Sequence, residues 1–181
     1  MPQVVFIMTD TQRKDMVGCY ADTGLQTPAL DRLAGQGVRF ERAYTCQPVC
    51  GPARAALFTG TYPHLNGGWT NSLALGDNIR TLGQRVADHG IPAAYIGKWH
   101  LDGSDYFGLG QAAPGWDPAY WYDMRNYLEE LTPEERVASR SPALNRDPNL
   151  TAEFTYGRRC SDRAIRYLEQ HAGNDFLLVL S

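Results

Sequence analysis

Runs of apolar residues, each followed by polar or turn residues, divide the chain into alternating strand and helix segments. Continuous apolar runs at 4–8, 92–97 and 176–181 are short, and they predict buried strands. Strands buried on both faces are typical of parallel sheets. Alternation at 38–44 predicts a further strand.

Apolar residues at helical spacing, with proline near the start and glycine after the end, predict the intervening helices. These segments are 27–34, 52–60, 78–89, 126–139 with a second start at Pro133, and 152–171. The order of strands and helices predicts a doubly wound α/β fold, with a mostly parallel sheet and helices on both faces. Because no helix follows the last strand, and no linker divides the chain, we expect a single domain that is apparently truncated. An aromatic-rich insertion is expected at about 103–150.

Composition narrows the class of protein without identifying it. The chain has 181 residues, a formal net charge of −3 and four cysteines, and it contains no run of Lys and Arg. We therefore expect neither a nucleic-acid nor a membrane partner. No signal peptide or transmembrane segment is visible, so a cytoplasmic location is expected, or a periplasmic or secreted one if a signal was removed.

Candidate chemistry begins at the turn before the predicted helix at 52–60. Cys50 would lie near the N-terminus of that helix, where unpaired N–H groups favour a reactive side chain, with Arg54 one turn further on. Cys46 and Cys50 also allow a disulfide or a pair of metal thiolates, although CxxxC without a second Cys/His cluster is weak for zinc. A buried, purely structural Cys50 is equally compatible with the pattern.

Two other predicted strands end in polar residues, which is where α/β sheets place ligands. Asp10 follows the first strand, but it would also serve to cap the next turn. Lys98 and His100 follow the strand at 92–97 and would face the same side of an extended backbone. Together they indicate an anion site, although each alone would ordinarily be solvated.

Aromatic residues gather in two irregular segments. His64 and Trp69 lie in a Gly- and Asn-rich loop, where they would touch substrate or, by default, cover the core. Trp116 and Trp121 lie in the insertion, where they would line a sugar or aryl pocket or simply pack on the domain.

Three separated motifs, in this order, resemble those of the type I sulfatases, which are formylglycine-dependent members of the alkaline phosphatase superfamily. Residues 50–54, CGPAR, resemble the CxPxR signature, and residues 97–100, GKWH, resemble the second signature. The start of the chain, 5–10 with 27–34, also looks like that family's start.

The resemblance implies an arylsulfatase-like hydrolase that cleaves sulfate monoesters of a small molecule or carbohydrate. It also implies that residues 1–181 are the N-terminal part of a sulfatase catalytic domain. Cys50 would be oxidised to formylglycine by a maturase, and its hydrate would provide the nucleophile. Arg54 would hold the hydrate, Lys98 would bridge nucleophile and sulfate, and His100 would transfer a proton. Asp10 and the modified Cys50 would bind a divalent cation, Ca²⁺ or alternatively Mg²⁺ or Mn²⁺.

The match departs from the family's pattern at Thr11, where many members have a second acid. Phosphonate and phosphodiester hydrolases on the same scaffold also carry a neutral residue there, so that substrate class stays open. The family's other cation ligands normally lie beyond residue 181. The chain alone is therefore expected to bind the cation weakly and to lack activity, and a non-catalytic binding module is a further alternative.

Overall fold

A computed structural model describes residues 2–22, 24–141 and 152–181. The chain divides into two compact units, one comprising Met1–Met8 and Cys46–Ser181 and the other Thr9–Thr45. The predicted insertion belongs to the larger unit, and its residues 142–151 lie outside the described part. Every predicted site residue except Asp10 also belongs to the larger unit.

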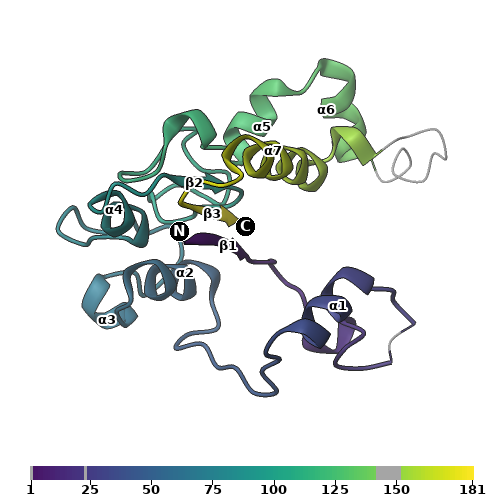
Figure 1. The fold of residues 1–181 in the computed structure, drawn as a ribbon. Helices are drawn as coiled ribbons and strands as arrows, with labels where there is room; N and C mark the ends of the chain where they lie inside the picture. The colour runs from purple at the N-terminus through teal and green to yellow at the C-terminus, as the bar shows by residue number, and fades with distance from the viewer. Residues whose placement is uncertain (1, 23, 142–151) are drawn as a thin grey trace. The chain divides into compact units, whose positions relative to one another are not determined.

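A three-stranded parallel sheet forms the centre of the larger unit (Figure 1). Its strands are β1 (Gln3–Ile7), β2 (Ala93–Ile96) and β3 (Phe176–Leu180), in the order β1-β3-β2. Leu178 of β3 stands between Val5 of β1 and Ala94 of β2. The last strand of the chain is thus central among the three, as expected for crossover connections through helices.

Helices cover both faces of this sheet because successive strand residues point to opposite sides. On one face, Tyr95 and Val179 pack in a cluster with Phe58 of helix α2 (Cys50–Thr59). On the other face, Ile96 and Leu178 pack with residues of helix α7 (Tyr156–His171). Figure 1 shows α7 and α2 on opposite sides of the strands. This arrangement confirms the doubly wound α/β prediction.

Local sequence signals account for most helix boundaries in the larger unit. Helix α2 ends at Gly60, which is left-handed with φ 70°, and α7 begins after Thr155, whose side chain accepts a hydrogen bond from the Arg158 N–H. Asp123 and Thr132 form capping boxes at the starts of their helices. The other helices are α3 (Pro63–Asn66), α4 (Leu82–Ala87), α5 (Met124–Glu130) and α6 (Pro133–Arg140), with 3₁₀ turns at Pro118–Tyr120 and Ala152–Phe154.

The smaller unit contains a 3₁₀ turn (Lys14–Met16) and helix α1 (Pro28–Gln36). Helix α1 starts at the predicted proline, whereas the strand expected at 38–44 is absent from the described residues. Val38 and Phe40 are 82% and 68% exposed. Alternation therefore predicted the wrong structure here, because a strand also needs a neighbour with which to pair.

Two further predictions needed correction. Strand β1 is not buried on both faces, since Val4 and Ile7 are 48% and 59% exposed at an edge of the described sheet. The helix expected at 78–89 is shorter, because Thr81 caps α4 and leaves 78–81 outside it. Among the described residues, no helix has the length and apolar character needed to cross a membrane.

Candidate active site

Cys50 is the first residue of α2, and an asparagine that the sequence analysis missed lies against it. The Asn71 side-chain oxygen lies 3.3 Å from Cys50 Sγ and accepts a hydrogen bond from the Gly51 N–H at 2.8 Å. A Cβ at position 51 would lie 2.9 Å from the same oxygen, so only glycine fits there without movement. Nothing in the spacing of the sequence distinguished Asn71 from other loop residues.

Both cysteines of the CxxxC turn are free thiols, so the disulfide interpretation is wrong. Among the described residues, no group of three or more His, Cys, Asp or Glu side chains is arranged to hold a metal ion. That finding gives no support to a pair of metal thiolates at Cys46 and Cys50. The described residues also do not by themselves fit the cation that the resemblance implies.

Arg54 extends from α2 to the ends of the two neighbouring strands, and only 4% of it is exposed. Its guanidinium donates to the Tyr95 hydroxyl at 3.3 Å, to Ser181 Oγ at 2.8 Å and to the Lys98 carbonyl. Because these partners lie far away in sequence, only the folded sheet brings them to the same side chain. Arg54 thereby joins the helix of Cys50 to the segment of Lys98.

The partners of Arg54 are neutral oxygens. Burial raises the pKa of Tyr95 to about 12, against the opposing effect of the Arg54 charge, so this hydroxyl stays protonated near neutral pH. The hydroxyl also donates to the Lys98 carbonyl at 2.6 Å. No carboxylate in the described ranges forms an ion pair with Arg54. A buried cation balanced only by dipoles favours the approach of an anion.

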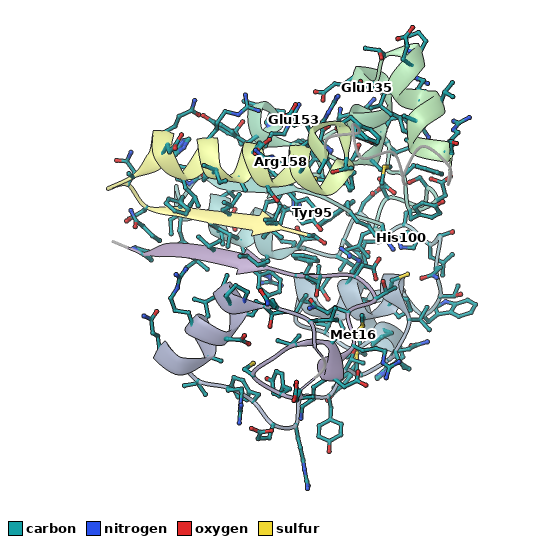
Figure 2. All side chains as sticks on the ribbon, turned by 90° about the vertical axis from the view of Figure 1, so that its right-hand side faces the viewer. Met16, Tyr95, His100, Glu135, Glu153 and Arg158 are labelled. Atoms are coloured by element: carbon teal, nitrogen blue, oxygen red, sulfur yellow. The ribbon has the colours of Figure 1, made fainter. Side chains whose placement is uncertain are left out.

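Lys98 and His100 follow β2, but not on an extended backbone. Gly97 has φ 121°, and a Cβ there would lie 1.7 Å from the Ser181 carbonyl oxygen. His100 has φ 60° and is only 5% exposed. The two-residue alternation used to place Lys98 and His100 on one side is therefore wrong, since it holds only for strands. Figure 2 shows His100 beyond the carboxyl end of β3, with Tyr95 alongside the strand.

Loop hydrogen bonds connect the segment that holds Cys50 with the segment that holds Lys98 and His100. The Leu75 N–H donates to the Leu101 carbonyl at 3.2 Å, and Ala74 forms an antiparallel bridge with Asp102. Asn71, on the same loop as Ala74, contacts Cys50. Within the larger unit, Asn71 thus contacts Cys50, Arg54 contacts the Lys98 carbonyl, and the two loops are bonded to each other beside His100.

Asp10 is exposed in the smaller unit, and Thr11 beside it has a left-handed φ of 60°. A non-glycine residue in that region is uncommon and marks a sharp local turn. Its role as a cation ligand stays a prediction.

The tryptophans of the insertion are buried, whereas the aromatic residues of the loop after α2 are exposed. Trp116 and Trp121 are 4% and 8% exposed and pack around Tyr95 in the core, which confirms that packing on the domain is their main contact. Trp69 is 62% exposed, so the prediction that it covers the core is wrong. His64 is exposed and stacks on Tyr62.

Comparison with known proteins is consistent with this arrangement. The chain is 50% identical, over 99% of its length, to the uncharacterized sulfatase YidJ of Escherichia coli, and it spans 37% of that protein. It is 30% identical, over 95% of its length, to the N-acetylglucosamine-6-O-sulfatase of Bacteroides thetaiotaomicron and spans 33% of it. The chain therefore spans about a third of the length of these relatives.

Solved structures give the same fold. The putative sulfatase yidJ of Bacteroides fragilis matches with a TM-score of 0.70 and 28% identity, over 99% of this chain and 43% of that one. The phosphonate monoester hydrolase of Agrobacterium radiobacter matches with a TM-score of 0.72 and 21% identity, over 99% and 40%. The family model described as Sulfatase matches residues 2–181. With the CGPAR and GKWH segments joined through Arg54, the chain belongs to the sulfatase family.

Proposed function

We propose that the complete protein hydrolyses sulfate monoesters at the site built around Cys50, Arg54, Lys98 and His100. The observation that carries the proposal is the buried Arg54 guanidinium, which has only neutral hydrogen-bond partners in the described residues and connects the helix of Cys50 to Lys98. A desolvated positive charge stabilises negative charge on a sulfuryl group more strongly than an exposed one does.

Each side chain has a role that its chemistry supports. Arg54 holds an oxygen anion at position 50, and Lys98 adds a second positive charge on the sulfate. His100 accepts or donates a proton at the same place. Asn71 orients position 50 by binding the adjacent Gly51 N–H.

Position 50 requires a modification that a formylglycine-generating maturase would introduce. Once Cys50 is oxidised to formylglycine, the aldehyde hydrate supplies an oxygen nucleophile and a second hydroxyl for release of sulfate. The divalent cation that the resemblance implies, Ca²⁺ or alternatively Mg²⁺ or Mn²⁺, stays a proposal, with the carboxylate of Asp10 and the oxygens of a modified Cys50 as candidate ligands by their chemistry alone. The described residues do not complete such a site.

We propose a sulfated carbohydrate as the substrate class. This choice is supported by the Bacteroides thetaiotaomicron relative, which is named for its action on an N-acetylglucosamine 6-O-sulfate. The proposal of a sulfated carbohydrate does not depend on Trp116 and Trp121, which are buried.

Mass spectrometry and turnover test the proposal together. The protein is produced with a formylglycine-generating maturase, and the peptide containing position 50 is expected to lose its thiol and gain an aldehyde. Cys50→Ala should abolish hydrolysis of sulfate esters, whereas Cys46→Ala should leave it unchanged, because Cys46 is exposed and has no proposed role at the site. An unmodified thiol after maturase treatment, or full activity of Cys50→Ala, would refute the proposal.

A phosphonate monoester or phosphodiester hydrolase is the second candidate, favoured by the neutral Thr11. Comparing kcat/KM for sulfate, phosphonate and phosphodiester esters of one alcohol decides between the two. We further propose that the 181-residue chain alone binds the cation weakly and is inactive. Robust turnover of an aryl sulfate by that chain would contradict this.

A further inference from the structure

The loop that follows His100 is an ordered structure that presents one exposed aromatic ring beside Lys98. Asp102 Oδ1 accepts hydrogen bonds from the N–H and hydroxyl of Ser104, at 3.1 and 2.7 Å. Asp105 Oδ1 accepts from the Phe107 N–H at 2.9 Å, and the Phe107 carbonyl accepts from the Arg125 N–H at 2.9 Å. These side-chain turns hold the backbone on both sides of Tyr106.

Tyr106 is 52% exposed, although its neighbours in the insertion, Trp116 and Trp121, are buried. Its ring lies 5.8 Å from Lys98 Nζ and 4.4 Å from the ring of Phe107, which is half-buried. The ammonium group is thus within cation–π range of the ring. An exposed ring on a hydrogen-bonded loop, at that distance from the proposed sulfate-binding lysine, borders the site without helping to fill the core.

We propose that Tyr106 is a substrate-contacting, specificity-determining residue that stacks on the sugar ring carrying the sulfate. This inference rests on the proposed function. If Lys98 Nζ binds a sulfate oxygen at a hydrogen-bond distance of about 3 Å, the carbon skeleton of the ester lies within reach of the Tyr106 face. Stacking there costs little ordering entropy, because the loop is already held by Asp102 and Asp105.

Kinetics of the complete, modified protein test this role with N-acetylglucosamine 6-sulfate as the probe. Tyr106→Ala should raise KM roughly five- to tenfold and change kcat little, because a stacking contact is lost. Tyr106→Phe keeps the ring and should stay within about twofold of the wild type. Tyr62→Ala is the matched control, since Tyr62 is also an exposed aromatic residue, 62% exposed, but contacts only His64 among the ring pairs.

Inhibition by inorganic sulfate separates stacking from an effect on Lys98. Sulfate has no ring, so its inhibition constant should be the same in Tyr106→Ala and in the wild type. A larger inhibition constant in Tyr106→Ala would show that Tyr106 acts by positioning Lys98. The stacking proposal would then be overturned. Unchanged saccharide KM in Tyr106→Ala would overturn it too.

Binding measured by calorimetry tests the role of Tyr106 without requiring hydrolysis. Cys50→Ala is titrated with N-acetylglucosamine 6-sulfate, with and without Tyr106→Ala, and the double variant should bind roughly five- to tenfold more weakly. If the wild type hydrolyses no sulfate ester but this difference is found, the proposed function fails and the role of Tyr106 stands. Equal affinities, or no binding by either variant, reject the role of Tyr106.

Discussion

At the scale of the residue, the structure contains two kinds of buried charged side chain. Asp123 is 1% exposed, and its carboxylate accepts from the N–H groups of Gly110 and Arg125 and from Trp121 Nε1, among others. Arg54 is buried almost as deeply, but it contacts residues of the predicted site. The first residue stabilises the fold through its hydrogen bonds, and the second is the one that we propose takes part in the chemistry.

We expect Arg54→Met to abolish turnover while the free energy of unfolding stays unchanged or rises by up to about 2 kcal/mol. Removing the guanidinium eliminates a buried charge, and the Lys98 carbonyl keeps its hydrogen bond from Tyr95. Urea unfolding of the 181-residue chain measures the stability, and sulfate-ester hydrolysis by the complete protein measures the activity.

Asp123→Ala is the contrasting variant for that experiment. It leaves buried N–H donors without an acceptor and should lower the free energy of unfolding by about 3 kcal/mol or more. A loss of more than about 2 kcal/mol in Arg54→Met would show that the guanidinium is structural.

Asn71→Ala should lower kcat at least about tenfold and change stability by less than about 1.5 kcal/mol. The exposed Asn71 amide orients the residue at position 50 through Gly51, so its removal affects position more than packing. Steady-state kinetics beside the neighbouring exposed variant Thr70→Ala measure this. Equal kcat in the two variants would exclude a positioning role.

At the scale of the element, the end of β2 determines where Lys98 and His100 lie. The Gly97 N–H donates to the Tyr122 carbonyl at 2.6 Å, and the Lys98 N–H donates to the Ser181 carbonyl at 3.3 Å. The backbone of β3 thus passes directly against Gly97, where no side chain fits. A close approach of two strands, rather than flexibility, explains this glycine.

Gly97→Ala should therefore lower the free energy of unfolding by more than about 3 kcal/mol, because the new methyl group would overlap the Ser181 carbonyl. Gly90→Ala is the matched control: Gly90 has φ 68° but open space around it, so only the conformational cost of about 1–2 kcal/mol applies. Urea unfolding compares the two. Similar losses would mean that the strands separate easily at this point.

At the scale of the whole molecule, burial of phenols and a thiol makes stability depend on alkaline pH. Burial raises the pKa of Cys160 from 9.0 to about 12, and it raises the pKa values of Tyr95 and Tyr167 from 10.0 to about 12. The pKa values of Tyr122 and Tyr156 are also raised, mainly by burial. Each group keeps its proton longer in the folded chain than in the unfolded one.

We expect the free energy of unfolding to fall as pH rises from 9.0 towards about 12. In that window the unfolded chain releases protons that the folded chain retains, so alkaline pH favours unfolding. Urea unfolding at several pH values measures the slope. Cys160→Ala should reduce the fall in the free energy of unfolding at the lower end of this pH range. An increase in the free energy of unfolding at pH values above 9.0 would contradict the prediction.

Most of the elements were predictable because their signals are local. Helix α6 starts at Pro133 with its Thr132 cap, and α7 ends at His171 as expected from the sequence. The prediction of a strand at 38–44 was wrong because a local pattern does not show whether a pairing partner is present. Strand β1 was identified, but its burial was not, since exposure depends on which elements cover it.

The sequence by itself determined the parallel α/β architecture, the place of Cys50 at a helix start, and the order of the CGPAR and GKWH segments. Proline, glycine, capping residues and hydrophobic period act over a few residues, so they can be read directly. Only the tertiary structure decided that Arg54 joins Tyr95, Lys98 and Ser181, that Asn71 contacts Cys50, and that Tyr106 is exposed while Trp116 is buried. The contact between Arg54 and Ser181 joins residues 127 positions apart, and it forms only once β3 has paired with β2 beside α2.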